Sequence, residues 1–308
     1  MEAEERFLGL DIGGTKCAVV LGDVQGRVLG KQAFATGEAP GWKGMLELLL
    51  EAAERLQRDE GRRARCVGIS CGGPLDSRRG VLFAPPNLPG WENAPLCAHV
   101  QGRLGLACYL QNDANACALA EWRYGAGKGC RHMAFLTFGT GLGAGLILNG
   151  ALYEGASGMA GELGHLRLDG KGPVGYNKAG SFEGFCSGGG LAKLAKLRLG
   201  QELSAKELVE RADAGDAAAA GVLRESASRL GQGLSLLVDL INPERIVIGS
   251  VYARAERWFR QEALRVMREE CLAESLAAVE LLPSALGEGI GDVAALAVAV
   301  DGWRRAHG

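Results

Sequence analysis

Two stretches of the chain repeat one pattern, in which an apolar run, a glycine-rich turn and a second apolar run follow one another. The first is LGLDIGGTKCAVVLGD at residues 8–23, and the second is AFLTFGTGLGAGLILNG at residues 134–150. Short apolar runs bounded by glycine are typical of buried strands. Self-similarity between distant segments indicates an internal duplication. We therefore expect two similar modules, each with a pair of strands joined by a glycine turn.

Strands and helices alternate along the rest of the chain. Apolar runs predict further strands at residues 65–70, 107–110 and 245–248. Apolar periodicity and helix stop signals predict helices at residues 43–57, 114–124, 223–241 and 292–303, the last of them capped by Asp292. This alternation indicates an α/β architecture.

Length and charge narrow the class of protein. A chain of 308 residues is long enough for two domains of about 150 residues each. The formal net charge of −2 gives no basic field for nucleic acid or an anionic membrane, and no apolar run reaches the roughly 20 residues of a membrane span. The polar, acidic segment Met1–Arg6 is unlike a secretory signal. We therefore expect a cytoplasmic protein.

The first glycine turn follows an acidic residue at the end of a strand. Backbone N–H groups of Gly13, Gly14 and Thr15 could cradle a phosphate, and Asp11 could hold Mg²⁺ through water, because Mg²⁺ binds few carboxylates and keeps several waters. An ordinary hairpin turn is an equally weighted interpretation of this segment taken alone.

The second turn has glycine at every other position from Gly139 to Gly145. Alternate glycines leave one face of a strand without side chains, so a nucleotide or another backbone can approach closely. The spacing matches neither GxGxxG nor a Walker A loop, so neither a Rossmann site nor a P-loop is predicted. A tight hairpin is again the simpler alternative, but the presence of two matched glycine turns in a repeat makes it less favoured.

A third candidate is the segment Asn112–Asn115, between a predicted strand and a predicted helix. Asp113 could accept the proton of a sugar hydroxyl as that oxygen attacks phosphorus. Asp and Asn are also preferred helix N-caps, and the segment by itself favours that structural role.

Taken together, these motifs resemble the ROK family (repressors, open reading frames and kinases) of the actin-like ATPase superfamily. The motifs DIGGTK, CGGPLD, PPNLPGW, QNDANA, FGTGLGAGLILNG, GELGH and NPERIVIG occur in the family's order between Leu8 and Gly249. Several independent motifs in order make the resemblance specific. It implies a two-domain, ribonuclease H-like α/β fold with ATP and sugar in the cleft between the domains.

The resemblance also implies roles for individual residues. Asp113 corresponds to the catalytic base of family kinases, and Asp11 belongs to the first phosphate motif. Carboxylates and amides suit sugar binding because they can bridge vicinal hydroxyls. The implied phosphate ligands are Asp11, Gly13, Gly14, Thr15, Lys16, Gly139, Thr140 and Gly141, with Gly249 at the adenosine, and the implied sugar ligands are Asn87, Asn112, Asp113, Glu162, His165 and Glu183.

The chain departs from the family pattern in two places. Many members carry a zinc motif, C-x-C-G-x-x-G-C-x-E, but its three thiolate positions are Val174, Tyr176 and Ser181 here. Because structural zinc takes about four N or S ligands, we expect no structural zinc and a loop held by packing that involves Tyr176 and Phe182. Bulkier residues than the family's glycines also follow Gly249, which would alter the adenine pocket.

We thus expect a small domain of residues 1–117 plus 290–308, and a large domain of residues 118–289. The implied reaction is ATP- and Mg²⁺-dependent phosphorylation of a hexose, at the primary hydroxyl of glucose or a relative, by a homodimer. Alternatives are a kinase for N-acetylmannosamine or N-acetylglucosamine, and a sugar sensor without catalysis. A repressor is disfavoured, because a strand that begins at Phe7 leaves no room before it for a DNA-binding domain.

Overall fold

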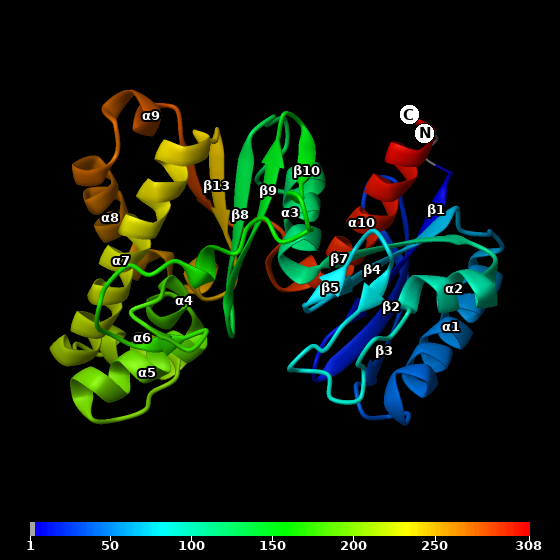
Figure 1. Cartoon of the computed structure of the whole chain (residues 1–308), viewed down its shortest axis with the longest axis horizontal. Coiled ribbons are helices and arrows are strands. Elements are labelled where there is room, and N and C mark those ends of the chain that lie inside the picture. The colour runs from blue at the N-terminus through cyan, green and yellow to red at the C-terminus, as the bar shows by residue number, and fades with distance from the viewer. Residues whose placement is uncertain (1–3) are drawn as a thin grey trace. The chain divides into compact units, whose positions relative to one another are not determined.

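The computed structural model describes residues 4–308, and their contacts group them into two compact units (Figure 1). Unit 1 contains the described residues up to Lys128, together with Gly155–Gly158 and Glu288–Gly308. Unit 2 contains Gly129–Glu154 and Met159–Gly287. The limit that we placed at residue 117 falls inside helix α3 (Asp113–Tyr124), and the whole of that helix lies in unit 1.

Unit 1 is built on a five-stranded sheet with the order β3-β2-β1-β4-β7. The first three strands form an antiparallel meander, and β4 and β7 run parallel to β1. The parallel strands are joined by crossovers, as parallel pairing requires. The strands are β1 (Arg6–Ile12), β2 (Lys16–Asp23), β3 (Val28–Ala35), β4 (Cys66–Cys71) and β7 (Ala107–Asn112), and β5 (Leu75–Asp76) pairs with β6 (Val81–Leu82) in a separate hairpin.

Different helices cover the two faces of this sheet. Side chains alternate along a strand, so Leu8 and Leu10 of β1 share a buried cluster with residues of α1 (Gly41–Glu60) and α2 (Leu96–Leu104). Phe7 of the same strand instead shares a cluster with residues of α10 (Ile290–His307). The C-terminal helix therefore returns to unit 1 and packs on the face opposite α1.

Unit 2 repeats this plan. Its sheet has the order β10-β9-β8-β13-β14, with an antiparallel meander followed by two parallel strands. The predicted duplication and the ribonuclease H-like α/β fold are thus confirmed by strand order and direction. The strands are β8 (Met133–Phe138), β9 (Leu142–Leu148), β10 (Ala151–Tyr153), β13 (Arg245–Ile248) and β14 (Glu280–Pro283).

Helices α7 and α8 pack against each other in unit 2 and share its large apolar core with the strands. Within residues 4–308, no helix combines the length and apolar character needed to cross a membrane. The helices are α4 (Phe182–Phe185), α5 (Gly188–Leu199), α6 (Ala205–Asp213), α7 (Ala217–Ile241), α8 (Val251–Glu270) and α9 (Ala273–Ala277), with short turns η1 (Leu163–His165) and η2 (Gly287–Gly289) and a hairpin of β11 (Val174–Gly175) and β12 (Lys178–Ala179).

The start of α10 corrects one prediction. Asp292 is not its N-cap, because η2 leads directly into a helix that begins at Ile290, with Gly289 as the cap residue. Asp292 therefore lies in the first helical turn, where a carboxylate interacts favourably with the helix dipole. Its Oδ2 accepts a charged hydrogen bond from Lys31 Nζ of β3 at 2.5 Å.

The close approach of α10 to the sheet generates a stability prediction. A Cβ at Gly68 of β4 would lie 2.3 Å from both Ala295 O and Ala299 N, which are backbone atoms that cannot move aside cheaply. Because overpacking typically costs about 1–3 kcal/mol and sometimes more, we expect Gly68→Ala to lower the free energy of unfolding by about 3 kcal/mol or more in urea titrations.

Gly102 supplies the matched control, because a Cβ there would meet no atom within 4 Å. Since alanine favours helix over glycine, Gly102→Ala in α2 should stabilise the protein by up to about 1 kcal/mol. Equal effects of the two substitutions would contradict the packing of α10 on β4.

Candidate active site

The first glycine turn is held through its carbonyl groups, which leaves backbone donors free. Gly13 N–H donates to Lys16 O at 3.0 Å and closes the turn between β1 and β2. Thr36 donates its hydroxyl to Gly13 O at 2.6 Å and its N–H to Thr15 O at 3.1 Å. Within the described residues, the N–H groups of Gly14 and Thr15 donate to no protein acceptor. Such free amides suit a phosphate.

Asn87 lies directly against this turn. A Cβ at Gly14 would lie 2.8 Å from Asn87 O, so only glycine fits at this contact. Asn87 itself is exposed, and it is followed by the buried side chains of Leu88 and Trp91, which anchor its loop in the core. The structure therefore places one predicted sugar ligand beside the first predicted phosphate loop.

Asp11 is the penultimate residue of β1, close to the turn, in an environment that disfavours its charged form. Burial raises the pKa of Asp11 to about 6, with further contributions from the negative charges of Asp292 and Asp113, while Lys31 and Lys16 oppose the increase. The sequence did not reveal the Lys31–Asp292 pair, because its members are separated by 261 positions. No local pattern reports a contact over that distance.

The start of the helix after β7 tests the capping interpretation of Asp113. Asn112 is the N-cap of α3, and its Oδ1 accepts the Asn115 N–H at 2.7 Å. Asp113 occupies the first helical position instead, where its Oδ1 accepts the Ala114 N–H at 2.8 Å. The capping interpretation of Asp113 is therefore wrong, and the side-chain oxygen of Asn112 is committed to the cap.

The environment of Asp113 raises the pKa of its carboxyl, although the residue is exposed. The density of protein atoms around the carboxyl raises the pKa of Asp113, and hydrogen bonds from the backbone of Ala114 and of Asp113 itself partly offset this. A carboxyl can be accessible to solvent from one side and poorly solvated on the others.

The second glycine turn, in unit 2, has the same design as the first. Gly139 N–H donates to Gly141 O at 3.1 Å and closes the turn between β8 and β9. The start of α5 holds it, because Gly188 and Gly189 donate to Gly139 O and Thr140 O at 2.7 and 3.3 Å. The N–H groups of Thr140 and Gly141 donate to no acceptor in the described part of the chain.

Three predicted sugar ligands lie near this second turn. Glu183 Oε2 accepts the Leu142 N–H at 3.1 Å, and a Cβ at Gly141 would lie 2.7 Å from the same oxygen. His165 ends η1, with its Nε2 3.8 Å from Glu162 Oε2. Glu183 thus links the predicted sugar-binding region to the second predicted phosphate loop, a contact that spacing alone did not predict.

Gly249 follows β13, next to the end of β8. Its N–H donates to Leu136 O at 2.9 Å, and a Cβ would lie 3.1 Å from the Phe135 ring. Ser250 comes next, with φ 56° and ψ −119°. Glycine adopts this backbone region far more readily than serine, so Ser250 is strained. The segment after Gly249 thus departs from the family in sequence and has an uncommon backbone conformation at Ser250.

Each turn, taken within its own unit, has backbone donors that suit phosphate, and Asp11 suits a hydrated Mg²⁺. Each turn has two adjacent unpaired N–H groups for phosphate oxygens, and a cation beside Asp11 would compensate a carboxylate that is otherwise poorly solvated. Among residues 4–308, no three His, Cys, Asp or Glu side chains cluster as a complete metal site. Mg²⁺ would therefore be held by Asp11, water and phosphate.

The residues at the family's zinc motif do not fit zinc. Val174 is exposed and has no donor atom. Ser181 is buried and caps α4, since its Oγ accepts the Gly184 N–H at 3.0 Å. Tyr176 stacks on the His165 ring with a centroid separation of 3.6 Å. Each position is thus occupied by a side chain that makes protein contacts or has no ligand atom.

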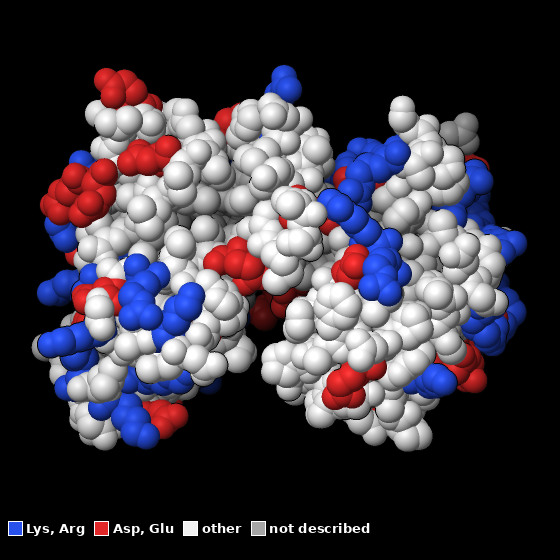
Figure 2. Space-filling model, in the orientation of Figure 1, with Lys and Arg blue, Asp and Glu red and all other residues white. Residues whose placement is uncertain are grey.

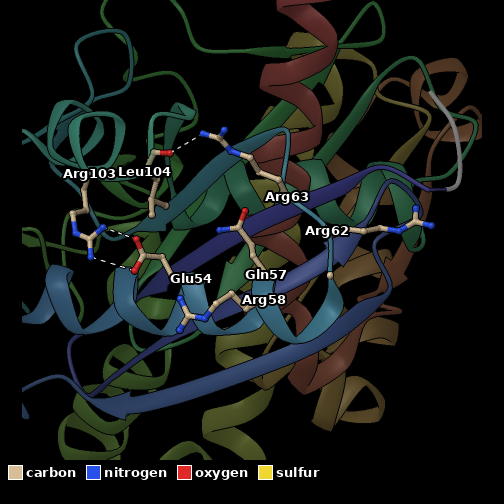
Figure 3. A pocket seen from close by; sticks show the side chains of 8 residues that line it. Glu54, Gln57, Arg58, Arg62, Arg63, Arg103 and Leu104 are labelled. Atoms are coloured by element: carbon tan, nitrogen blue, oxygen red, sulfur yellow. Dashed lines mark hydrogen bonds and ion pairs between the residues drawn. The ribbon is translucent and has the colours of Figure 1, made fainter.

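A separate pocket of unit 1, at the ends of α1 and α2, is not a good candidate for catalysis (Figure 3). Arg58, Arg62, Arg63 and Arg103 line it. Arg103 donates to both carboxylate oxygens of Glu54 at 2.5 and 3.2 Å, and Arg62 and Arg63 donate to main-chain carbonyls. Three of the four arginines are therefore already bonded within the protein, and none of the predicted site residues lines the pocket.

The raised pKa of Asp11 predicts how stability depends on pH. The folded chain binds this proton more tightly than the unfolded chain, whose carboxyl has the ordinary pKa of 3.8. The free energy of unfolding therefore falls as pH rises through the window from about 4 to about 6. Between pH 4.5 and 7.5, urea titrations should find that Asp11→Asn gains about 2 kcal/mol relative to the wild type. A constant difference between the two proteins would contradict this environment.

Comparison with known proteins agrees with these motifs. A model of the ROK family matches residues 7–301. A glucokinase of Halalkalibacterium halodurans is 31% identical over 268 residues, which cover 81% of each chain. A ROK hexokinase from Thermus thermophilus superposes with a TM-score of 0.89 at 34% identity, over 97% of this chain and 99% of the other. A ROK glucokinase from Streptomyces griseus, solved with glucose and AMPPNP, gives 0.76 at 31% identity, over 96% and 99%. The chain therefore belongs to the ROK family.

Proposed function

We propose that this protein is an ATP-dependent sugar kinase that phosphorylates glucose or a closely related hexose at its primary hydroxyl. The observation that carries the proposal is the pair of matched glycine turns with free N–H groups, together with an accessible carboxylate, Asp113, at the start of α3. The relatives named above are glucokinases and a hexokinase, which supports a sugar as acceptor.

In the proposed reaction, Asp113 accepts the hydroxyl proton while the sugar oxygen forms a bond to the γ-phosphorus of ATP. The bond between the γ-phosphorus and the bridging oxygen breaks, and ADP leaves with that oxygen. A raised pKa makes Asp113 a stronger base than an ordinary aspartate, closer to the operating pH. Mg²⁺, when bound, would neutralise phosphate charge.

Each turn, within its own unit, offers preformed donors for phosphate oxygens. Backbone N–H groups of Gly14, Thr15, Thr140 and Gly141 need no reorganisation to bind phosphate oxygens, because the turns are already fixed by hydrogen bonds through their carbonyls. Preorganised donors of this kind typically contribute more than flexible ones. Lys16 adds positive charge at the first turn, and Gly249 keeps space beside β13 for the adenosine.

We assign the sugar hydroxyls to Asn87, Glu162, His165 and Glu183, with Asn112 in support. Glu183 uses one oxygen for the Leu142 N–H, which fixes its carboxylate and leaves the other oxygen for a hydroxyl. Asn112 has its oxygen committed to the cap of α3, so its contribution would come from the amide N–H₂. These assignments rest on the family motifs and on the placement of these residues beside the turns.

Two alternatives differ in substrate or in catalysis. A kinase for N-acetylmannosamine or N-acetylglucosamine would use the same base and turns, and the altered segment at residues 174–183 keeps it open. A sugar sensor would bind sugar without turnover. The retained carboxylates of Asp11 and Asp113 favour catalysis over sensing.

Our expectations for assembly and location follow from the family and the composition. We propose a cytoplasmic homodimer that uses Mg²⁺ and does not bind nucleic acid. On the face drawn in Figure 2, basic side chains form separate groups, several of them beside acidic ones, which is unlike a continuous nucleic-acid surface. Light scattering during size-exclusion chromatography measures the assembly directly.

The test is ATP consumption with Mg²⁺ across glucose, mannose, fructose, allose, glucosamine, kanosamine and the two N-acetylated sugars. We expect glucose to give the highest kcat/KM. Asp113→Asn should lower kcat about 100-fold to 10,000-fold, the usual contribution of a general base, while the Kd for sugar changes little.

Asp59→Asn is the matched control, because Asp59 is an exposed carboxylate on α1. It should leave kcat unchanged. A loss of less than tenfold for Asp113→Asn would overturn the assignment of the base. Turnover of only an N-acetylated sugar would establish the first alternative, and binding without any turnover would establish the second.

A further inference from the structure

The segment in place of the family's zinc motif forms a β-hairpin with an unusual turn. Strands β11 and β12 are joined by two residues, Tyr176 and Asn177, with φ of 48° and 57°. Two-residue hairpins favour such turns, but glycine and asparagine usually occupy them. A tyrosine in this conformation is uncommon, which indicates that its side chain is needed at this place.

The tip of the hairpin holds His165. The rings of Tyr176 and His165 are stacked, with centroids 3.6 Å apart and planes inclined by 30°. Lys178, on the second strand of the hairpin, donates from Nζ to His165 O at 3.0 Å. A Cβ at Gly164 would lie 2.9 Å from Tyr176 Cε2, so the tyrosine ring covers the backbone before the histidine as well.

The hairpin is itself anchored to the body of unit 2. Lys193 of α5 donates to Val174 O at 2.7 Å, and Gly180 N–H donates to Pro173 O at 3.0 Å across the base of the hairpin. Phe182, which follows the hairpin, is fully buried in the core of unit 2. Tyr176 therefore extends from a fixed base.

The contacts continue from the histidine to the second glycine turn. A Cβ at Gly164 would lie 3.3 Å from Glu183 Cβ, and the Glu183 carboxylate accepts the Leu142 N–H at the end of that turn. A continuous series of contacts thus runs from Tyr176 through Gly164 and Glu183 to Leu142. The tyrosine ring lies directly against His165, and Gly164 separates it from Glu183.

We propose that Tyr176 is a positioning residue for the sugar site, which orients His165 by ring stacking in the part of the fold where zinc coordination does not fit. The inference rests on the proposed function. The stack uses the face of the aromatic ring, which phenylalanine would retain. Tyr176 acts on sugar binding through His165 and does not take part in phosphoryl transfer.

Kinetics of three variants test this role. Tyr176→Ala should raise the KM for sugar about three- to tenfold, the loss expected when one aromatic pair is removed, with little change in kcat or in the KM for ATP. Tyr176→Phe should behave like the wild type. Val174→Ala, at an exposed position of the same hairpin, should also leave every constant unchanged.

NMR of the histidine rings gives a readout that does not depend on turnover. The chain has four histidines, and His165→Gln assigns the signal of His165. Its ring protons should be shifted upfield by the tyrosine in the wild type and in Tyr176→Phe, and should move downfield in Tyr176→Ala. Dialysis against a chelator should change neither the spectrum nor the KM for sugar.

Each result decides the proposal. An unchanged KM in Tyr176→Ala, or equal losses for sugar and ATP, would overturn the positioning role, and so would a chelator effect on His165. If the wild type shows no kinase activity, the proposed function fails separately, and titration of glucose into the wild type and Tyr176→Ala then decides whether Tyr176 supports sugar binding.

Discussion

The packing of the C-terminal helix on bare backbone is the constraint on which the first unit depends. Helix α10 lies close enough to β4 that Gly68 has no room for a side chain. The same helix begins against Asp11, since a Cβ at Gly291 would lie 2.6 Å from Asp11 Oδ2. The start of the last helix therefore packs against Asp11, the penultimate residue of the first strand. Asp292 adds its charge there, and Lys31 balances it.

The two units repeat one backbone arrangement, for which we propose phosphate binding. In each, an antiparallel pair of strands is joined by a glycine turn, and the carbonyls of the turn are hydrogen-bonded to neighbouring segments. The partner is Thr36 after β3 in unit 1 and the start of α5 in unit 2. Fixing the carbonyl groups turns the amides outward, so a duplicated backbone produces two sets of donors without a Walker A sequence.

The sequence predicted the repeated pattern of strand, glycine turn and strand, because glycine turns and apolar runs are local features that can be recognised without knowledge of contacts. It predicted less about side chains whose partners are distant. The sequence predicted Asp292 as the N-cap of the last helix, but Asp292 lies inside that helix and pairs with Lys31. Asp113 could not be separated from a capping role until Asn112 was seen to fill that role. The stack of Tyr176 on His165 also depends on a turn conformation that tyrosine rarely adopts.

The most direct test of the central claim is the ³¹P NMR spectrum, recorded with proton coupling, of the product formed from ATP, Mg²⁺ and glucose. A primary hydroxyl bears two protons on its carbon, so the account predicts a new phosphomonoester signal split by two protons, with ADP formed in equal amount. A signal split by a single proton would place the phosphate on another hydroxyl. ATP left intact beside bound glucose would contradict the account altogether.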